Sequence, residues 1–437
     1  MFPVQMNVTC SRSDTEHLAK GGHGRHRNLR PLDVGLLAQA EAAQCSVHRG
    51  AHHHLRQVRI LGHARSDLVE GVPETRHDAG SGVGQRAVQV EEDEFRPYPH
   101  TYIVSVRYHG DQAALPGMLD FAVNVRSAAP PSWLRDRLAA RLGDLGRYPS
   151  VDDANRAAAA VAVRHGRSDD EVLLLAGATE GFALLPNLRP RLAAVVAPSF
   201  TEPDAALAAS GIPVHHVVLP PPFTLASAAI PDDADLIIVG NPTNPTSVLH
   251  PREQIKPLRR PGRIVVVDEA FADAIPAEPE SLTAESLPDV VVLRSLTKTW
   301  ALPGLRVGYA LGSPEVLRRL ATTRPHWPLG TLQLEALTAC NSPDAVAEAN
   351  QQARRLVAMR AEMVDAISAI GVRVVDGQAP FVLFEVPDAH LARKHLATNG
   401  IAVRRCDTFV GLDGEFLRAA VRPEWPSLVA ALEEILS

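Results

Sequence analysis

From about Tyr102 onwards, the hydrophobic pattern of the chain alternates between strand-like and helix-like segments. Short Val/Ile/Leu runs, each ending in turn or polar residues, are separated by segments of helical periodicity. Near-continuous apolar strands of this kind are typical of a mostly parallel sheet that is covered on both faces. The runs are EVLLLAG (171–177), RLAAVVAP (191–198), VHHVVLP (214–220), ADLIIVGNP (234–242), GRIVVVDEAF (262–271) and DVVVLRSLTK (289–298).

Helical periodicity and a later change of pattern predict how the rest of the chain is organised. Residues 134–145 and 154–166 predict amphipathic helices. Beyond about residue 311, a long helical stretch over 342–371 precedes short strand-like runs, which predicts a smaller α+β unit of mainly antiparallel type. We expect four parts: a poorly structured extension (1–105), an N-terminal arm (106–130), a large α/β domain (131–310) and a small C-terminal domain (311–437).

The first hundred residues differ from the rest. They hold ten of the 18 histidines, including His52, His53 and His54, and neither a helical nor a strand period persists. The histidine run lacks cysteine or carboxylate partners at ligand spacing, so we predict no metal site. A loosely ordered extension, or translated sequence upstream of the functional start, fits better than a partner-binding arm.

Composition narrows the classes of function. The 437 residues are 46% hydrophobic and 22% charged, with a net charge of -6, which gives no reason to expect nucleic acid or an anionic membrane as a partner. No apolar run approaches the roughly 20 residues of a membrane span. The start of the chain lacks the features of a secretory signal, and the four cysteines have no paired spacing. We therefore expect a cytoplasmic protein.

The residues just after each apolar run are the candidates for chemistry, because ligands of parallel sheets bind at the carboxyl ends of the strands. GATEG (177–181) opens a helix after a strand, where free N–H groups suit a phosphate, although such junctions are common. GNPTNPTS (240–247) contains two Asn-Pro pairs that fix the amide side chains, or serve only as a rigid turn.

Two further strand ends carry charged residues. Asp268 directly follows the run VVV and is placed to point into the crevice, whereas Glu269 could lie at the surface. Lys298 in SLTKTW is one of only four lysines. An isolated lysine is usually solvated, but beside an apolar strand end it could act as an imine-forming nucleophile. Arg306, eight residues later, suits a phosphate dianion.

In this order, these segments resemble the fold-type I enzymes that use pyridoxal 5′-phosphate. SLTKTWALPGLRVGY (295–309) is similar to the lysine segment of the branch that holds histidinol-phosphate aminotransferases and the threonine-phosphate decarboxylases of cobalamin synthesis. The resemblance covers about residues 108–437. It implies a three-layer αβα large domain with a smaller C-terminal domain, and a homodimer.

The resemblance also implies a role for each matching residue. Lys298 would form a Schiff base with the cofactor and move the proton at the substrate Cα, and Asp268 would pair with the pyridinium nitrogen. Further roles concern the ring, the phosphate and the substrate. Asn244 and Phe200 would contact the ring; Ala178, Thr179, Ser295, Thr297, Arg306 and the neighbouring subunit's copy of Tyr148 would bind the phosphate; Arg418, Arg422 and His109 would contact the substrate.

The chain departs from the family pattern at two positions. Ser247 replaces the glycine of the family's NPTG turn, and Phe271 replaces a tyrosine of many histidinol-phosphate aminotransferases. Phe271, with YHGD (108–111) and DFAVN (120–124), is more similar to the cobalamin branch.

The expected function is a PLP-dependent aminotransferase acting on a small, phosphorylated amino acid. No motif reports whether the bond to hydrogen or to carboxylate breaks at the substrate Cα, so a threonine-phosphate decarboxylase and a histidinol-phosphate aminotransferase stay open as alternatives. A ligand-binding protein on the same fold is the alternative without catalysis. The Lys, Asp and Asn positions argue against it.

Overall fold

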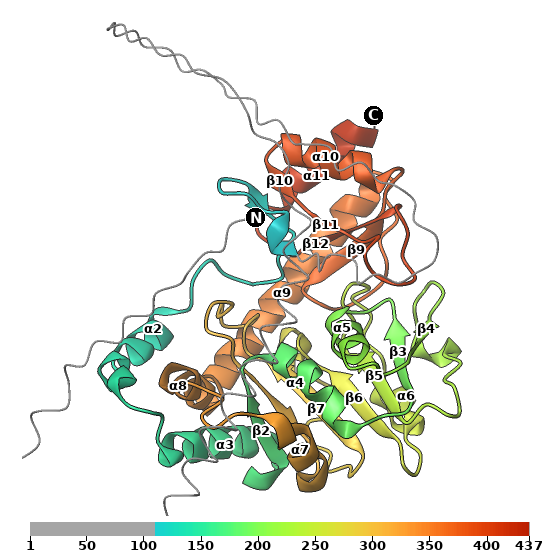
Figure 1. Ribbon diagram of the computed structural model, residues 1–437. Coiled ribbons are helices and arrows are strands. Elements are labelled where there is room, and N and C mark those ends of the chain that lie inside the picture. Colours follow the sequence, from blue (N-terminus) through green and yellow to red (C-terminus); the bar gives the residue numbers. More distant parts are fainter. Residues whose placement is uncertain (1–109, 437) are drawn as a thin grey trace, which may run out of the picture. The chain divides into compact units, whose positions relative to one another are not determined.

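Seven strands of the described residues form one sheet (Figure 1). The structure is a computed structural model that describes residues 110–436, so the predicted extension and His109 lie outside the described residues. All six apolar runs of the sequence form strands of this sheet, and β8 is the seventh. In sheet order the strands are β2 (Val172–Leu175), β8 (Gly308–Leu311), β7 (Val290–Ser295), β6 (Ile264–Asp268), β5 (Leu236–Gly240), β3 (Ala193–Ala197) and β4 (Val214–Val218).

The sheet is parallel except at β8, which pairs antiparallel with both β2 and β7. From β7 to β4 all neighbouring strands are parallel. The carboxyl ends of the six parallel strands therefore share one edge, and the start of β8 lies at that same edge. This confirms the predicted mostly parallel sheet.

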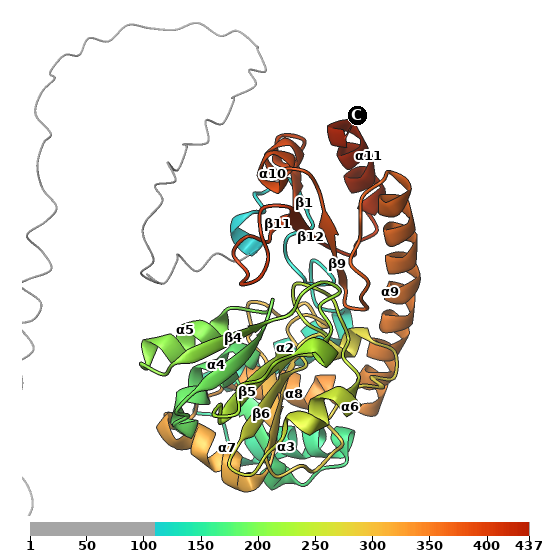
Figure 2. The same ribbon diagram turned by 90° about the vertical axis from the view of Figure 1, so that its right-hand side faces the viewer.

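Successive side chains along each strand enter different cores, which produces three layers. In β6, Val265 and Val267 join one hydrophobic cluster and Val266 joins another. Figure 2 shows the helices on opposite sides of the sheet. One side carries α3 (Val151–His165), α6 (Arg252–Ile255) and α8 (Thr331–Cys340); the other carries α4 (Ala178–Leu184), α5 (Glu202–Ala209) and α7 (Pro314–Leu320).

Residues 134–145 do not form the single helix that their periodicity predicts. The helix α2 (Ser132–Ala139) ends early, and a 3₁₀ helix over Leu142–Gly146 follows. Gly143 and Gly146 have low helix propensity, and Arg141 donates to Asp144 at 2.6 Å within the tighter turn. The predicted helix over 154–166 does form, as α3, and Gly166 ends it with a φ of 64°.

A second core lies around the C-terminal strands. The helix α9 (Pro343–Ala369) confirms the predicted long helix: Ala345 and Ala349 join the core of the large sheet, whereas Met363 and Ile367 join the second core. Its other elements form a mainly antiparallel unit, as expected. They are β9 (Phe381–Glu385), β11 (Arg404–Arg405) and β12 (Phe416–Ala420), with α10 (Ala389–Thr398) and α11 (Trp425–Leu436).

The segment before α2 connects the second core to the large sheet. Its strand β1 (Leu119–Asp120) pairs with β10 (Ile401–Ala402), and Phe121 is fully buried in the second core. A few residues later, the N–H of Arg126 donates to the carbonyl oxygen of Lys298 at 3.3 Å. No helix among residues 110–436 is long and apolar enough to cross a membrane.

Candidate active site

The fold brings the predicted polar residues to one edge of the sheet. Asp268 is the last residue of β6, Lys298 follows the end of β7, and Asn244 lies in the turn after β5. Because β8 is antiparallel, Arg306, just before its start, lies at the same edge. The carboxyl edge of the sheet is therefore the candidate site.

The carboxyl group of Asp268 lies where its charge is poorly solvated. It is half-buried and accepts a hydrogen bond from the N–H of Ala270 at 3.1 Å. Burial raises the pKa of Asp268 to about 6, and the charge of Glu269 adds to this, whereas the positive charge of Lys298 lowers that pKa. A further cation beside Asp268 would restore its ionised form, so the position suits a protonated ring nitrogen.

Asp268 borders a pocket that two aromatic rings line. Phe182 and Phe200 both line it, with ring centroids 6.1 Å apart. Such a wall can cover the face of a flat aromatic ring. The lining residues are Phe182, Ser199, Phe200, Pro203, Ile238, Gly240, Asn244 and Asp268.

The loop that carries Lys298 is fixed on both sides. The carbonyl oxygen of Lys298 accepts from Arg126, and the hydroxyl of Thr299 donates to a carboxylate oxygen of Asp273 at 3.2 Å. Lys298 is half-buried, and Thr299 is buried.

A cradle for an anion lies where α4 begins. Nη2 of Arg306 donates to the hydroxyl of Thr179 at 3.3 Å. A Cβ at Gly177 would lie 2.9 Å from that Nη2, and a Cβ at Gly308 would lie 2.6 Å from the carbonyl oxygen of Arg294. A side chain at Gly308 would meet backbone atoms, and a side chain at Gly177 would displace the guanidinium of Arg306. The exposed guanidinium of Arg306, next to a hydroxyl and a helix start, suits a phosphate group.

The other predicted phosphate ligands surround Gly308. Ser295 lies opposite Gly308 in the pairing of β7 with β8. The backbone nitrogen of Ala178 would lie 2.9 Å from a Cβ at Gly308. Thr297 is buried, and its hydroxyl donates to the carbonyl oxygen of Val307 at 3.5 Å. These residues therefore gather around the same point as Arg306.

The turn that carries Asn244 is braced by a buried histidine. The N–H of His250 donates to Oδ1 of Asn241 at 2.8 Å, and Nδ2 of Asn241 donates back to the carbonyl oxygen of His250 at 3.1 Å. Burial lowers the pKa of His250 to about 4, so its ring is neutral at pH 7. The ring also lies 3.2 Å from the hydroxyl of Thr243. The turn is thus held by polar contacts as well as by its two prolines.

Arg418 is a buried cation whose hydrogen-bond partners are neutral. Its Nη1 donates to Oδ1 of Asn244, and its Nη2 donates to the carbonyl oxygen of Ala122 at 2.7 Å. Its Nε has no partner among the described residues. Burial lowers the pKa of Arg418 to about 9, and the charge of Arg404 adds to this. An anion bound here would stabilise the guanidinium.

Arg422 and His109 are the other residues predicted to contact the substrate. Arg422 donates to the carbonyl oxygen of Val123 at 3.1 Å, and its guanidinium lies 3.9 Å from the carboxylate of Asp120. It is therefore directed towards the segment that precedes α2 and already has a carboxylate nearby. His109 is not among the described residues.

Tyr148, predicted to act across a subunit interface, lies on the surface of the described chain. Its side chain is 72% exposed and stacks on Trp327, which is 57% exposed, with ring centroids 4.2 Å apart. Two exposed aromatic rings in contact form an apolar patch that a partner protein could cover.

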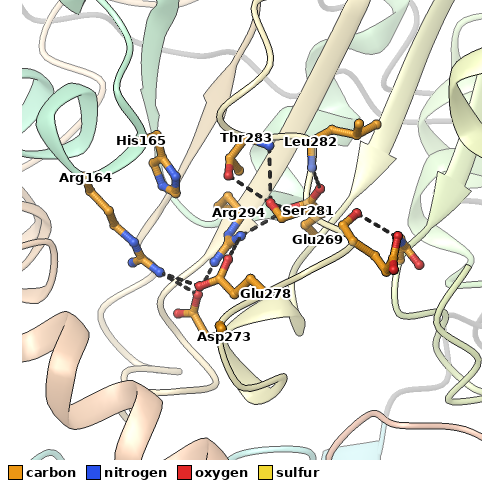
Figure 3. A network of polar contacts seen from close by, with 12 residues as sticks. Arg164, His165, Glu269, Asp273, Glu278, Ser281, Leu282, Thr283 and Arg294 are labelled. Atoms are coloured by element: carbon orange, nitrogen blue, oxygen red, sulfur yellow. Dashed lines mark hydrogen bonds and ion pairs between the residues drawn. The ribbon is translucent and has the colours of Figure 1, made fainter. Parts of the chain in front are cut away.

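A buried ion cluster beside the site escaped the sequence analysis. Arg294 in β7 donates to Glu269 at 3.0 Å and to Glu278 at 2.5 Å, and also bonds Asp273 (Figure 3). Arg164 of α3 donates to Asp273 at 2.9 Å. Glu269 is only 1% exposed, so the possible surface position considered for it is wrong. An arginine inside an apolar strand is the signal that could have revealed the cluster.

Sequence comparisons point to one family. Residues 116–427 match the family model described as aminotransferase class I and II. A histidinol-phosphate aminotransferase of Mycobacterium tuberculosis is 66% identical over 332 residues, which are 76% of this chain and 91% of that protein. A threonine-phosphate decarboxylase of Salmonella typhimurium is 30% identical over 340 residues, covering 73% of this chain and 92% of that protein.

The fold is also that of solved aminotransferases. The histidinol-phosphate aminotransferase of Sinorhizobium meliloti, solved in complex with pyridoxal 5′-phosphate, has a TM-score of 0.63 and 20% sequence identity. The match covers 72% of this chain and 89% of that one. At this identity the match supports the fold class, which agrees with the three layers described above.

The raised pKa of Asp268 predicts how replacing this residue changes the free energy of unfolding. Its folded value of about 6 lies above the ordinary 3.8, so ionising Asp268 destabilises the fold as pH rises through 6. In the cofactor-free protein, Asp268→Asn should raise the free energy of unfolding at pH 8 by on the order of 2 kcal/mol. The gain should shrink towards pH 4.5.

Urea denaturation of the cofactor-free protein at both pH values measures this difference. Asp233→Asn, at an exposed aspartate, is the matched control and should show little change at either pH. An Asp268→Asn variant that is no more stable than the wild type at pH 8 would contradict the assigned environment.

Proposed function

The chain belongs to the aminotransferase class I and II family, and we propose that it is a histidinol-phosphate aminotransferase. The family places it among pyridoxal-phosphate-dependent transferases. The observation that carries the finer proposal is the 66% identity to the Mycobacterium tuberculosis enzyme over 91% of that enzyme's length.

The cofactor is pyridoxal 5′-phosphate, and the residues at the carboxyl edge fit it. When bound, this cofactor supplies a pyridine ring that accepts the electron pair released at the substrate Cα. Asp268 would hold the proton on the ring nitrogen, and Phe200 would cover one face of the ring. Oδ1 of Asn244 accepts from Arg418, which leaves the Nδ2 amide to donate to the phenolate oxygen.

The anion cradle at the start of α4 would hold the cofactor's phosphate. Arg306 supplies the charge, and its contact with Thr179 places a hydroxyl beside it. Gly308 keeps the backbone close to this point, and Gly177 leaves space for the guanidinium of Arg306. The remaining donors would be the backbone N–H groups of Ala178 and Thr179 and the hydroxyls of Ser295 and Thr297.

Lys298 would move the proton in the reaction. Its amine would accept the proton from the substrate Cα, and the fixed loop around it would limit where the amine can reach. The contacts of Lys298 with Arg126 and of Thr299 with Asp273 restrain the main chain on both sides of this amine.

Arg418 would orient the substrate by binding its anionic group. Histidinol phosphate carries a phosphate and the amino acceptor 2-oxoglutarate carries an α-carboxylate, so one guanidinium can serve both substrates in turn. The unpaired Nε and the neutral partners of Arg418 support this role. We keep Arg422 as a second candidate for the group that binds the substrate carboxylate, and His109 as a contact for a phosphate on the substrate.

We also propose a homodimer in which Tyr148 contacts the phosphate bound by the other subunit. The exposed stack of Tyr148 on Trp327 supports a covered surface at this position. Arg324, in the same segment as Trp327, pairs with Glu180 in the first turn of α4 at 2.8 Å. The patch is therefore linked to the helix that begins at the cradle.

The proposed location is the cytoplasm, with no membrane or nucleic acid as a partner. Cys340 and Cys406 are free and buried, as expected in a reducing compartment. The net charge of -6 offers nucleic acid no attraction.

A threonine-phosphate decarboxylase of cobalamin synthesis is the second candidate. The Salmonella typhimurium decarboxylase covers 73% of this chain at 30% identity, and Phe271 stands where many histidinol-phosphate aminotransferases have tyrosine. Phe271 packs edge-on against Phe381 with ring centroids 5.0 Å apart, so it fills apolar space and offers no hydroxyl. The lower identity makes this function the runner-up.

The two functions are separated by two incubations of the purified holoenzyme. With histidinol phosphate and 2-oxoglutarate, we expect glutamate to form, because the amino group is transferred. With threonine phosphate alone, we expect no carbon dioxide. Lys298→Ala is the control and should lower glutamate formation at least 1000-fold, in the range of losing a proton-transferring residue and covalent attachment together. Release of carbon dioxide without glutamate would reverse the assignment.

The homodimer predicts a mass of twice 47.0 kDa in sedimentation. Tyr148→Glu should weaken the dimer, because it places a charge in the apolar patch that the proposed dimer would bury. Val163→Glu, at another exposed apolar side chain, is the matched control and should leave the mass unchanged. A wild-type protein that sediments as a monomer with full activity would rule out the interface.

A further inference from the structure

Ser247 lies at the end of the turn that carries Asn244. Its N–H donates to the carbonyl oxygen of Thr243 at 2.8 Å, which closes the turn over Asn244. Its φ is 68°, in the left-handed region that favours glycine, and its side chain is fully buried. A serine in this conformation needs a compensating contact.

That contact is with the segment that leads into β9. The N–H of Ala379 donates to Oγ of Ser247 at 2.8 Å, and the N–H of Gln378 donates to the Ser247 carbonyl oxygen at 2.7 Å. A Cβ at Gly377 would lie 2.6 Å from the Ser247 carbonyl, so the two backbones touch. The large sheet and the second core are thus joined at this point.

The segment that contains Ala379 continues to Phe381, whose ring contacts the guanidinium of Arg418. Phe381 begins β9, and the guanidinium carbon of Arg418 lies 5.2 Å from its ring centroid. Arg418 in turn donates to Oδ1 of Asn244. Chain segments and contacts therefore connect these residues in a ring. The turn joins Asn244 to Ser247, the Ser247 contact reaches Ala379, the chain leads on to Phe381, and Arg418 lies between Phe381 and Asn244.

We propose that Ser247 is a positioning residue that sets where Arg418 lies relative to Asn244. By holding Ala379, it fixes the start of β9 and hence the aromatic ring on which Arg418 rests. The substrate's anionic group is then held at a set distance from the ring-binding residues. This inference rests on the proposed roles of Arg418 and Asn244.

Stability alone does not account for Ser247. A non-glycine residue at this φ is unfavourable. The hydroxyl of Ser247 offsets this, because it accepts from the N–H of Ala379 at 2.8 Å and donates to the carbonyl oxygen of Ala379 at 3.5 Å. Ser247→Gly removes both effects at once, and the N–H of Ala379 keeps its longer contact of 3.3 Å with the carbonyl oxygen of residue 247. The variant should therefore fold with a nearly unchanged melting temperature.

Steady-state kinetics of the holoenzyme with histidinol phosphate and 2-oxoglutarate test the inference. Ser247→Gly should raise KM for the anionic substrates about tenfold, with kcat changed less than threefold. The visible absorption of the bound cofactor should not shift, because no cofactor contact is removed. Ser210→Gly, at an exposed serine, is the matched control and should leave KM unchanged.

Arg418→Ala separates failure of the inference from failure of the proposed function. If Ser247 acts through Arg418, adding Ser247→Gly to Arg418→Ala should raise KM no further. A tenfold additional rise in the double variant would overturn the inference, as would an unchanged KM in Ser247→Gly when Arg418→Ala raises it. An unchanged KM in Arg418→Ala itself would remove Arg418 from substrate binding, and the inference would fall with that assignment.

Discussion

The charge of Asp268 is the constraint on which the site depends. Its strand is apolar up to Val267, and burial favours the neutral acid, so the ionised carboxylate needs a cation beside it. The carboxyl edge offers Lys298 and, with the cofactor bound, the ring nitrogen. A ring nitrogen that stays protonated makes the ring an effective electron acceptor. The contact that would stabilise the charge of Asp268 would therefore also support the proposed chemistry.

The surrounding structure keeps these groups in place from two directions. Asp273 bonds Arg294 within β7 and Thr299 directly after Lys298, so one buried carboxylate connects the strand to the reactive loop. On the other side, Ser247 connects the Asn244 turn to β9. Buried ions of this kind contribute little net stability when complete, but losing one partner is costly. These energetics favour a role for the buried ions in fixing the positions of β7 and of the loop that carries Lys298.

The sequence allowed the strand ends to be identified, because each apolar run is local and its last residue is visible. Asp268 and Lys298 could be selected on that basis, whereas Arg418 and Tyr148 required resemblance to a family. The contact of Ser247 with Ala379 and the pairing of Arg164 with Asp273 join residues more than a hundred positions apart. Such contacts depend on how the layers pack, which periodicity does not report. Periodicity also overstated the helix over 134–145, where Gly143 and Gly146 lower the helix propensity.

Identification of the lysine that binds the cofactor tests the central claim most directly. Borohydride reduction of the holoenzyme, followed by proteolysis and mass spectrometry, would fix the cofactor on its lysine and report the position. The chain has only four lysines, Lys20, Lys256, Lys298 and Lys394, so the assignment is unambiguous. The account predicts the pyridoxyl label on Lys298 in the peptide that contains SLTKTW. A label on any of the other three, or no label in protein that binds the cofactor, would contradict it.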